Sequence, residues 1–150
     1  MDIILGTGIN NICFGMNEGE VIEILGLPTK RHFNDVEGYL YLEYYPICTK
    51  FKFDEDEGFK LTNIETSNRD ALIFGEKILG REKNEVIALL NSKGYTDFDW
   101  EDYEYFDELF CEKLSLWITF EYDRVTALEF FLFSNENDDE FLWPEIPEKD

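Results

Sequence analysis

The sequence predicts an α+β fold: a tandem repeat of one helix plus an antiparallel β-meander, with the helices packed on one face of the sheet. Two observations predict it. The first is a pair of sequence matches that recur in the same order at nearly the same spacing. The second is the pattern after each predicted helix, where β-branched and aromatic residues alternate with polar ones. Strands that follow one another along the chain and are joined by short turns pair antiparallel, and the helices then cover one face of the resulting sheet.

The matches indicate an internal duplication. The segment Gly15–Leu25 resembles Gly80–Leu90 at an offset of 65 residues, with Gly, Glu, Val and Ile at equivalent positions. Downstream, Leu61–Glu65 resembles Val125–Glu129 at an offset of 64 residues. Ordered matches at one spacing are typical of repeat architectures. We therefore expect a single domain over 1–150, with repeats at about 8–67 and 72–133 and an acidic C-terminal tail at 134–150.

Each repeat is expected to begin with a short amphipathic helix. Three apolar residues share one helical face in each: Val21, Ile24 and Leu25 in the first, and Val86, Leu89 and Leu90 in the second. Asn17 with Glu20 three residues later has the form of a capping box. Gly26 and Gly94 are expected to end the helices. Helices of two to three turns are marginal alone, so they must pack on the sheet.

The strands are predicted from alternation and from turn residues. In the first repeat they are Tyr39–Tyr45, Cys48–Asp54 and Leu61–Thr66, and in the second Tyr103–Phe106, Leu114–Tyr122 and Val125–Phe133. The tight connection at Asp123 predicts a hairpin between the last two. His32, the single histidine, is expected in a surface loop after the first helix.

Alternation also predicts which side chains lie on the face without helices. In the first strand Leu40, Leu42 and Tyr44 are expected in the core, and Tyr39, Tyr41, Glu43 and Tyr45 on the opposite face. In the long strand the apolar row is Leu114, Leu116, Ile118, Phe120 and Tyr122, and the other row is Ser115, Trp117, Thr119 and Glu121. Tyrosine and tryptophan interleaved with glutamate are typical of a protein interface. The alternative is that the C-terminal tail, with Trp143, covers these residues.

A run of acidic and aromatic residues follows the second helix. The partner-binding residues expected from this run and from the open face are Tyr39, Tyr41, Glu43, Asp97, Asp99, Trp100, Glu101, Asp102, Tyr103, Trp117 and Glu121. An acidic loop with aromatic residues matches a basic, partly apolar pocket on a partner. The other acidic cluster, Asp54–Glu57, is expected to be a solvated turn.

The charge restricts the class of partner. The sequence has 13 basic and 34 acidic residues and a net charge of −21, while a hydrophobic fraction of 44% indicates a folded chain. Nucleic acid and anionic membranes are repelled by this charge, so neither is an expected direct partner. A basic protein partner is favoured, because opposite fields accelerate encounter. The alternative is that the acidity serves solubility alone.

The cysteines and the N-terminus predict a cytoplasmic protein. Cys13, Cys48 and Cys111 are far apart and form no C-x-x-C pair, so we expect free thiols in a reducing compartment rather than disulfides or a zinc site. The first residues lack the basic start of a signal peptide, and no apolar stretch approaches the roughly 20 residues of a membrane span. We expect a monomer or a weak dimer.

No enzymatic motif is present in the sequence. It lacks G-x-S-x-G, H-E-x-x-H and a P-loop, and it has one histidine. The loop Asp54–Gly58 lacks the ligand spacing of an EF-hand. We therefore expect no catalysis, no metal and no cofactor, and keep a metal-dependent hydrolase built on the acidic clusters as a weaker alternative.

Two sets of short motifs resemble bacterial immunity proteins that protect against polymorphic toxins. Those in the first repeat are Gly8–Ile12, Phe14–Met16, Glu20–Val21 and Leu25–Pro28, and those in the second are Leu72–Gly75, Gly80, Glu85–Ile87, Leu90 and Gly94–Tyr95. The tandem layout is also similar to the β-lactamase inhibitor protein architecture, which binds its target across a concave sheet. That extracellular inhibitor would be expected to have a signal peptide and disulfides, and this chain shows neither, which favours an intracellular target.

The resemblance implies an immunity protein that neutralises a cognate toxin by occluding its active or substrate site. Nucleases grip phosphates and are commonly basic, so carboxylates here would stand where phosphates bind. Other hypotheses are an acidic nucleic-acid mimic, another protein-binding inhibitor, and a scaffold that associates with itself through the aromatic face.

Overall fold

The computed structural model describes residues 1–147, which form two helices and two sheets. The helices are α1 (Glu18–Leu25) and α2 (Lys83–Ser92). The smaller sheet has the order β3-β2-β1-β8-β9, with β1 (Asp2–Ile4), β2 (Gly8–Ile9), β3 (Ile12–Cys13), β8 (Leu72–Ile73) and β9 (Glu76–Lys77). Its β1–β8 pair is parallel and its other pairs are antiparallel.

The larger sheet has eight strands, and every neighbouring pair is antiparallel. Its order is β10-β11-β12-β13-β7-β6-β5-β4, with β4 (Lys30–Asn34), β5 (Tyr39–Tyr44), β6 (Thr49–Asp54), β7 (Lys60–Thr66), β10 (Asp99–Asp102), β11 (Asp107–Cys111), β12 (Leu116–Glu121) and β13 (Arg124–Phe131). The protein is therefore mixed α+β and mostly antiparallel, as the sequence predicts. Each helix is followed in the chain by four strands of this sheet.

The two helices are built differently at their starts. The capping box of α1 is confirmed: the Asn17 side chain accepts from the Glu20 amide at 2.9 Å, and the Glu20 carboxylate accepts from the Asn17 amide at 3.1 Å. The helix ends at Gly26, whose φ of 83° favours glycine. Helix α2 has no side-chain cap, and its first amide, on Lys83, donates instead to the carbonyl of Asp123 in the β12–β13 turn. This bond ties α2 to the strands that follow it.

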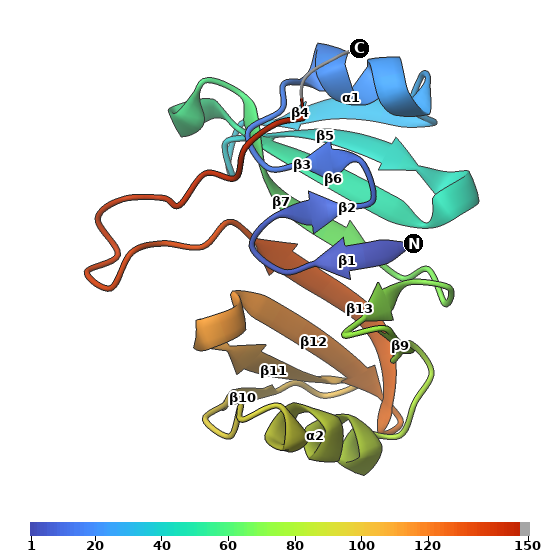
Figure 1. Cartoon of the computed structure of the whole chain (residues 1–150). Coiled ribbons are helices and arrows are strands. Elements are labelled where there is room, and N and C mark those ends of the chain that lie inside the picture. Colours follow the sequence, from blue (N-terminus) through green and yellow to red (C-terminus); the bar gives the residue numbers. More distant parts are fainter. Residues whose placement is uncertain (148–150) are drawn as a thin grey trace.

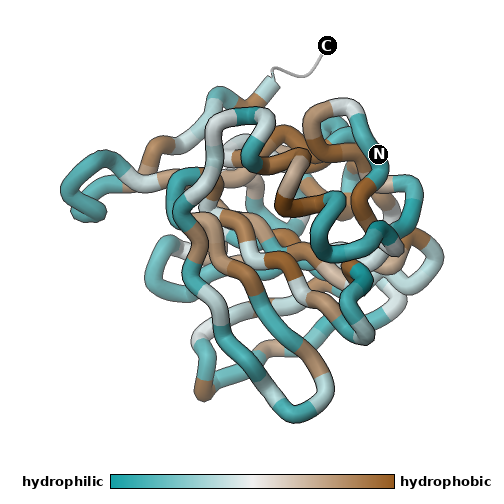
Figure 2. Tube along the Cα trace, turned by 90° about the horizontal axis from the view of Figure 1, so that it is seen from below, coloured by the Kyte–Doolittle hydropathy of each residue, from teal (hydrophilic) through white to brown (hydrophobic). Residues whose placement is uncertain are grey.

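One hydrophobic core joins the helices to the eight-stranded sheet. Val21 of α1 and Val86 of α2 are fully buried in the same cluster as Leu42, Phe51 and Ile118. Figure 1 shows α1 and α2 at opposite ends of the molecule, with β1–β3 between them. In Figure 2 the hydrophobic segments gather inside the molecule, and hydrophilic residues occupy the turns. Helices and small sheet thus cover one face of the large sheet and leave the other open.

The two halves of the large sheet repeat several backbone details. In the first half, the Gly15 amide donates to the Leu61 carbonyl, and the Leu61 amide donates to the Met16 carbonyl. In the second half, the Gly80 amide donates to the Val125 carbonyl, and the Val125 amide donates to the Arg81 carbonyl. A register shift lies between Lys52 and Phe53 in the first half, and another lies before Phe120 in the second. Short 3₁₀ helices precede β6 and β12, at Tyr45–Ile47 and Glu112–Leu114, and each ends at a residue with left-handed backbone.

Several local expectations are wrong. Tyr45 and Leu114, expected at the ends of strands, lie in the two 3₁₀ helices. Tyr103–Phe106 is the turn between β10 and β11, because the acidic Asp99–Asp102 pairs with β11 in its place. Tyr122 is 96% exposed, since the β12–β13 turn gives it a positive φ that ends the alternation. His32 lies in β4, where pairing with Tyr41 of β5 orders a segment expected to be a loop.

The C-terminal segment leaves the sheet as an arm. Residues 134–141 turn back on themselves through an isolated bridge between Ser134 and Phe141, and the arm projects from the molecule in Figure 1. Trp143 then lies beside Gly15 and under the Lys60 ammonium, 5.1 Å from the ring centroid, and remains 37% exposed. Within residues 1–147 no helix has the length and hydrophobicity needed to cross a membrane.

Candidate functional site

The candidate site is the open face, which we define as the face of the eight-stranded sheet opposite the helices. Strand register places one row of side chains across all eight strands of this face: Asp99, Phe110, Trp117, Glu129, Glu65, Lys50, Glu43 and Lys30. Residues directly opposite one another in adjacent strands share a face and lie close together. The row changes character along its length, from aromatic in β11–β12 to alternating charges in β7–β4.

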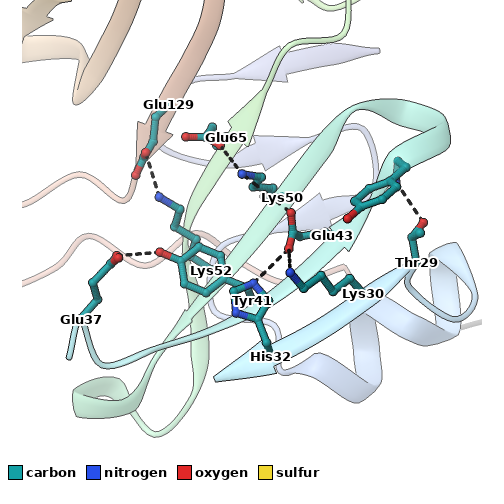
Figure 3. Close-up of polar contacts among 11 residues, drawn as sticks. Thr29, Lys30, His32, Glu37, Tyr41, Glu43, Lys50, Lys52, Glu65 and Glu129 are labelled. Atoms are coloured by element: carbon teal, nitrogen blue, oxygen red, sulfur yellow. Dashed lines mark hydrogen bonds and ion pairs between the residues drawn. The ribbon is translucent and has the colours of Figure 1, made fainter. Parts of the chain in front are cut away.

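The β4–β7 half of the open face is a network of neutralised charges centred on Glu43 (Figure 3). The Glu43 carboxylate is 3.0 Å from His32 Nε2, and Lys50 Nζ lies 3.7 Å from it. Lys50 Nζ is also 3.4 Å from Glu65, and Lys30 Nζ is 4.0 Å from Glu43. The Glu43 side chain is only 10% exposed, and a carboxylate so shielded requires these partners.

Tyr41 and Lys52 continue this network toward the middle of the sheet. Lys52 Nζ donates to Glu129 Oε1 at 2.9 Å and lies 5.4 Å from the Tyr41 ring centroid. His32 stacks on the other side of this tyrosine, with centroids 4.8 Å apart. The Tyr41 hydroxyl donates to Glu37 at 2.6 Å. Burial, this hydrogen bond and the Glu37 charge raise the pKa of Tyr41, so it remains a neutral donor.

The β10–β13 half of the open face carries an aromatic cluster. Phe110 stacks on Trp117 with centroids 4.5 Å apart, and on Phe131 with centroids 6.0 Å apart. All three rings are half-buried. A cavity of about 270 Å³ next to them is lined by Trp117, Phe131, Glu129, Tyr39 and the arm residue Phe141. These rings present a preorganised apolar surface, because their positions are fixed by one another.

Two glutamates face each other beside the aromatic cluster. Glu101 of β10 and Glu108 of β11 are directly opposite in the register. The Tyr103 hydroxyl donates to Glu101 at 2.5 Å, but neither carboxylate has an ion pair with a cation within residues 1–147. Burial, reinforced by the charges of Glu101, Glu129 and Glu65, raises the pKa of Glu108. Like charges opposite each other destabilise a sheet, and a cation from outside would relieve this repulsion.

The raised pKa gives a prediction for stability. A carboxyl with a higher pKa in the folded state binds more protons there, so stability falls as pH rises through the window between the unfolded and folded values. The penalty persists at pH 7. We expect Glu108→Gln to unfold at a higher urea concentration than the parent at pH 7, and at the same concentration near pH ~3.5, where Glu108 is protonated in both states. The matched control Glu140→Gln, exposed on the arm, should change neither midpoint. A lower midpoint for Glu108→Gln at pH 7 would contradict the repulsion.

The structure distributes the sequence-predicted residues over three places. Asp99, Glu101, Trp117 and Glu121 lie on the open face of β10 and β12, and Tyr39, Tyr41 and Glu43 lie on the open face of β5. Trp100 and Asp102 point to the helix side of β10, where Trp100 is 5.9 Å from Phe120 between ring centroids. Asp97 is exposed in the loop before β10, and Tyr103 stacks on Phe106 in the turn after it.

Several residues of the open face have no counterpart in the sequence prediction. They are His32, Lys50, Lys52, Asn63, Glu65, Glu108, Phe110, Glu129 and Phe131. Lys50 and Lys52 alternate with the buried Phe51 and Phe53, so the same period-2 reading would have found them. To predict Glu108 and Phe110 on the open face, one would need to know where β11 begins.

Comparisons with known proteins give a fold likeness and no family. No protein-family model and no curated protein matches the sequence. A crystal structure of an extracellular protein containing a SCP domain from Bacillus anthracis strain Ames is similar, with a TM-score of 0.50 and 9% identity. The matched region covers 79% of this chain and 44% of that one, so this chain spans less than half of that protein. At this identity the likeness concerns the fold alone.

Proposed function

We propose that this chain is an immunity protein that binds a basic toxin, foremost a nuclease, and occludes its substrate site with the open face. The observation that carries the proposal is the β10–β13 half of that face, where the unneutralised Glu101–Glu108 pair lies beside the stack of Phe110, Trp117 and Phe131. These five residues are called the acidic–aromatic patch below.

The contrast between the two halves favours a partner of positive charge. In the β4–β7 half, Lys30, Lys50 and Lys52 already neutralise the carboxylates around them. In the acidic–aromatic patch, no lysine or arginine among residues 1–147 forms an ion pair with Glu101 or Glu108. The net charge of −21 adds to the attraction for a cationic partner. A lysine or arginine of a partner would remove the like-charge repulsion and stack on the rings at the same time. Aromatic anchors supply affinity, and the carboxylates supply encounter rate and selectivity.

Tandem duplication of a helix-plus-meander unit is part of the proposal. The paired Gly15–Leu61 and Gly80–Val125 hydrogen bonds support it, as do the register shifts before Phe53 and Phe120. The proposal also places the protein in the cytoplasm. There Cys13, Cys48 and Cys111, which are free thiols, stay reduced.

The test uses the product of the gene adjacent to this one, since immunity genes lie beside the genes of their toxins. We expect a one-to-one complex by calorimetry that weakens as salt rises, because salt screens the attraction between opposite charges. If the adjacent product is a nuclease, an equimolar amount of this protein should abolish its cleavage of duplex DNA or RNA. An adjacent basic protein that neither binds nor loses activity would overturn the immunity proposal.

A further inference from the structure

We propose that the cavity between the aromatic cluster and the arm is a guanidinium-binding pocket that takes one arginine side chain of the toxin. The source of the arginine rests on the proposed function, whereas the chemistry of the pocket rests on the residues that line it. The cavity of about 270 Å³ is bounded by four rings, those of Tyr39 in β5, Trp117 in β12, Phe131 in β13 and Phe141 in the arm. The carboxylates of Asp54 and Glu129 also line it.

The size and the rings of this guanidinium pocket select the head group of a single cation. Sites for drug-sized ligands have volumes of about 300–1,000 Å³, and this cavity is smaller. Aromatic rings carry negative potential on their faces, so several rings around a small space attract an organic cation. A single basic side chain therefore matches the cavity in both volume and charge.

Asp54 supplies negative charge that no cation of the described chain neutralises. Its Oδ1 accepts from the Asp56 amide at 2.9 Å, and within residues 1–147 its carboxylate forms no ion pair. Lys60 is directly opposite Asp54 in the sheet register, but its ammonium lies over the Trp143 ring, 5.1 Å from the centroid. The nearest strand partner of Asp54 is thus engaged by the arm, and the carboxylate remains available to a ligand.

Glu129, in contrast, is already neutralised and fixes one wall of the pocket. Lys52 Nζ donates to its Oε1 at 2.9 Å (Figure 3), and Asn63 donates to its Oε2 at 3.1 Å. Burial raises the pKa of Tyr39, and the charges of Asp54 and Glu129 raise it further, so the field in the cavity is negative. An apolar side chain placed here would desolvate Asp54 without pairing it, whereas a cation would pair with it.

The lining favours a guanidinium over an ammonium. A guanidinium is planar and weakly hydrated, so it stacks on aromatic rings more readily than a compact, strongly hydrated ammonium. Its fork of donors can bind a carboxylate while its plane contacts a ring. Tyr39 and Asp54 are directly opposite each other in the β5–β6 register, so a ring and a free carboxylate are adjacent in the same wall. Arginine is the side chain that uses both.

Phe141 is the one ring of the pocket that comes from outside the sheet. It is 39% exposed, and its ring lies 5.7 Å from that of Trp143 between centroids, edge to face. The Leu142 amide donates to the Phe133 carbonyl at 2.8 Å, which holds the arm to the end of β13. A substitution of Phe141 therefore removes one wall of the pocket without changing the core.

An NMR titration of the full chain with N-acetyl-arginine amide tests the pocket in the absence of the toxin. We expect saturable shifts of the Trp117 indole and the Asn63 side-chain amide, which line the pocket, with a Kd in the millimolar range. N-acetyl-norleucine amide should cause no such shifts, since it leaves Asp54 unpaired. The net charge of −21 attracts any cation, so N-acetyl-lysine amide is the control for non-specific binding. It should bind at least about threefold more weakly than the arginine probe.

Two substitutions with matched controls assign the binding to this pocket. Phe141→Ala should weaken the arginine probe about fivefold, and Asp54→Asn about tenfold, because one removes a ring and the other removes the free charge. Asparagine keeps an oxygen that accepts from the Asp56 amide. Leu142→Ala and Glu55→Gln alter the exposed neighbours of these residues, do not line the pocket, and should leave the Kd unchanged. Thermal unfolding checks that each variant is folded.

The pocket and the proposed function can fail separately. Phe141→Ala and Asp54→Asn should weaken binding of the adjacent-gene toxin by factors similar to those for the probe. A toxin that binds both variants with unchanged affinity overturns the inference and leaves the immunity proposal standing. Absence of saturable shifts, or equal binding of the arginine and lysine probes, also overturns the inference. An arginine probe that binds as expected, together with a toxin that does not bind, overturns the immunity proposal and the toxin as the source of the arginine, while the guanidinium pocket stands.

Discussion

Phe130→Ala is expected to lower the free energy of unfolding by about 3–5 kcal/mol, the usual loss for a large aromatic side chain removed from a core. Phe130 is fully buried in β13, the strand that joins the two halves of the large sheet, and its ring lies 5.8 Å from that of Phe14 between centroids. A small domain has only about 5–15 kcal/mol in total. The variant should therefore be close to unfolding at 37 °C, as measured by urea or thermal denaturation.

The next residue supplies the control. Phe131 has the same side chain in the same strand but lies on the open face, half-buried against Phe110. Phe131→Ala should lower stability by about 1 kcal/mol and should instead weaken binding of the adjacent-gene toxin. Equal losses of stability in the two variants would show that the open face is part of the folding core, and would remove Phe131 from the proposed patch.

Glu101→Lys combined with Glu108→Lys should weaken the complex with the proposed toxin by about 100-fold, or about 2.7 kcal/mol, because two contacts proposed as attractive become repulsive. The residual affinity should also lose most of its dependence on salt. The fold should survive, because the nearby carboxylates of Glu129 and Glu65 offset the repulsion between the two lysines. Calorimetry at two salt concentrations measures both effects.

The matched control carries the same charge change on the arm. Glu136→Lys with Glu140→Lys alters the net charge equally, and both residues are exposed and away from the sheet. If affinity depended only on total charge, the two double variants would bind alike. Loss in the patch variant alone would assign the effect to Glu101 and Glu108, whereas unchanged binding there would remove them from the interface.

The sequence predicts elements where one face is buried and the alternation is clean. In β12, Leu116, Ile118 and Phe120 are buried while Trp117 and Thr119 are not, as expected. The capping box at Asn17 is equally local, because three residues contain the whole motif. The coarse α+β class follows from such elements, since each apolar face needs a covering layer.

The edge strand β10 could not be predicted from the sequence. Asp99–Asp102 has low intrinsic strand preference and is ordered by pairing with β11, while Tyr103, Tyr105 and Phe106 have high preference and form the turn. The error of a few residues removed Glu108 and Phe110 from the predicted site. Opposition of Glu101 and Glu108 is a consequence of register, which a strand without a clean buried face does not specify.

The burial pattern of β12 and β13 also bears on how this protein could evolve. Buried residues and open-face residues alternate along β12 and over 127–131 of β13, so substitution at every second position there leaves the core untouched. Equivalent places of the two halves already differ in this way: Lys50 and Trp117 lie on the open face, while the neighbouring Phe51 and Ile118 are both buried. Such a sheet can change its recognition specificity repeatedly without passing through an unfolded ancestor, and a protein engineer could randomise the open face of β10–β13 as a library on a constant scaffold.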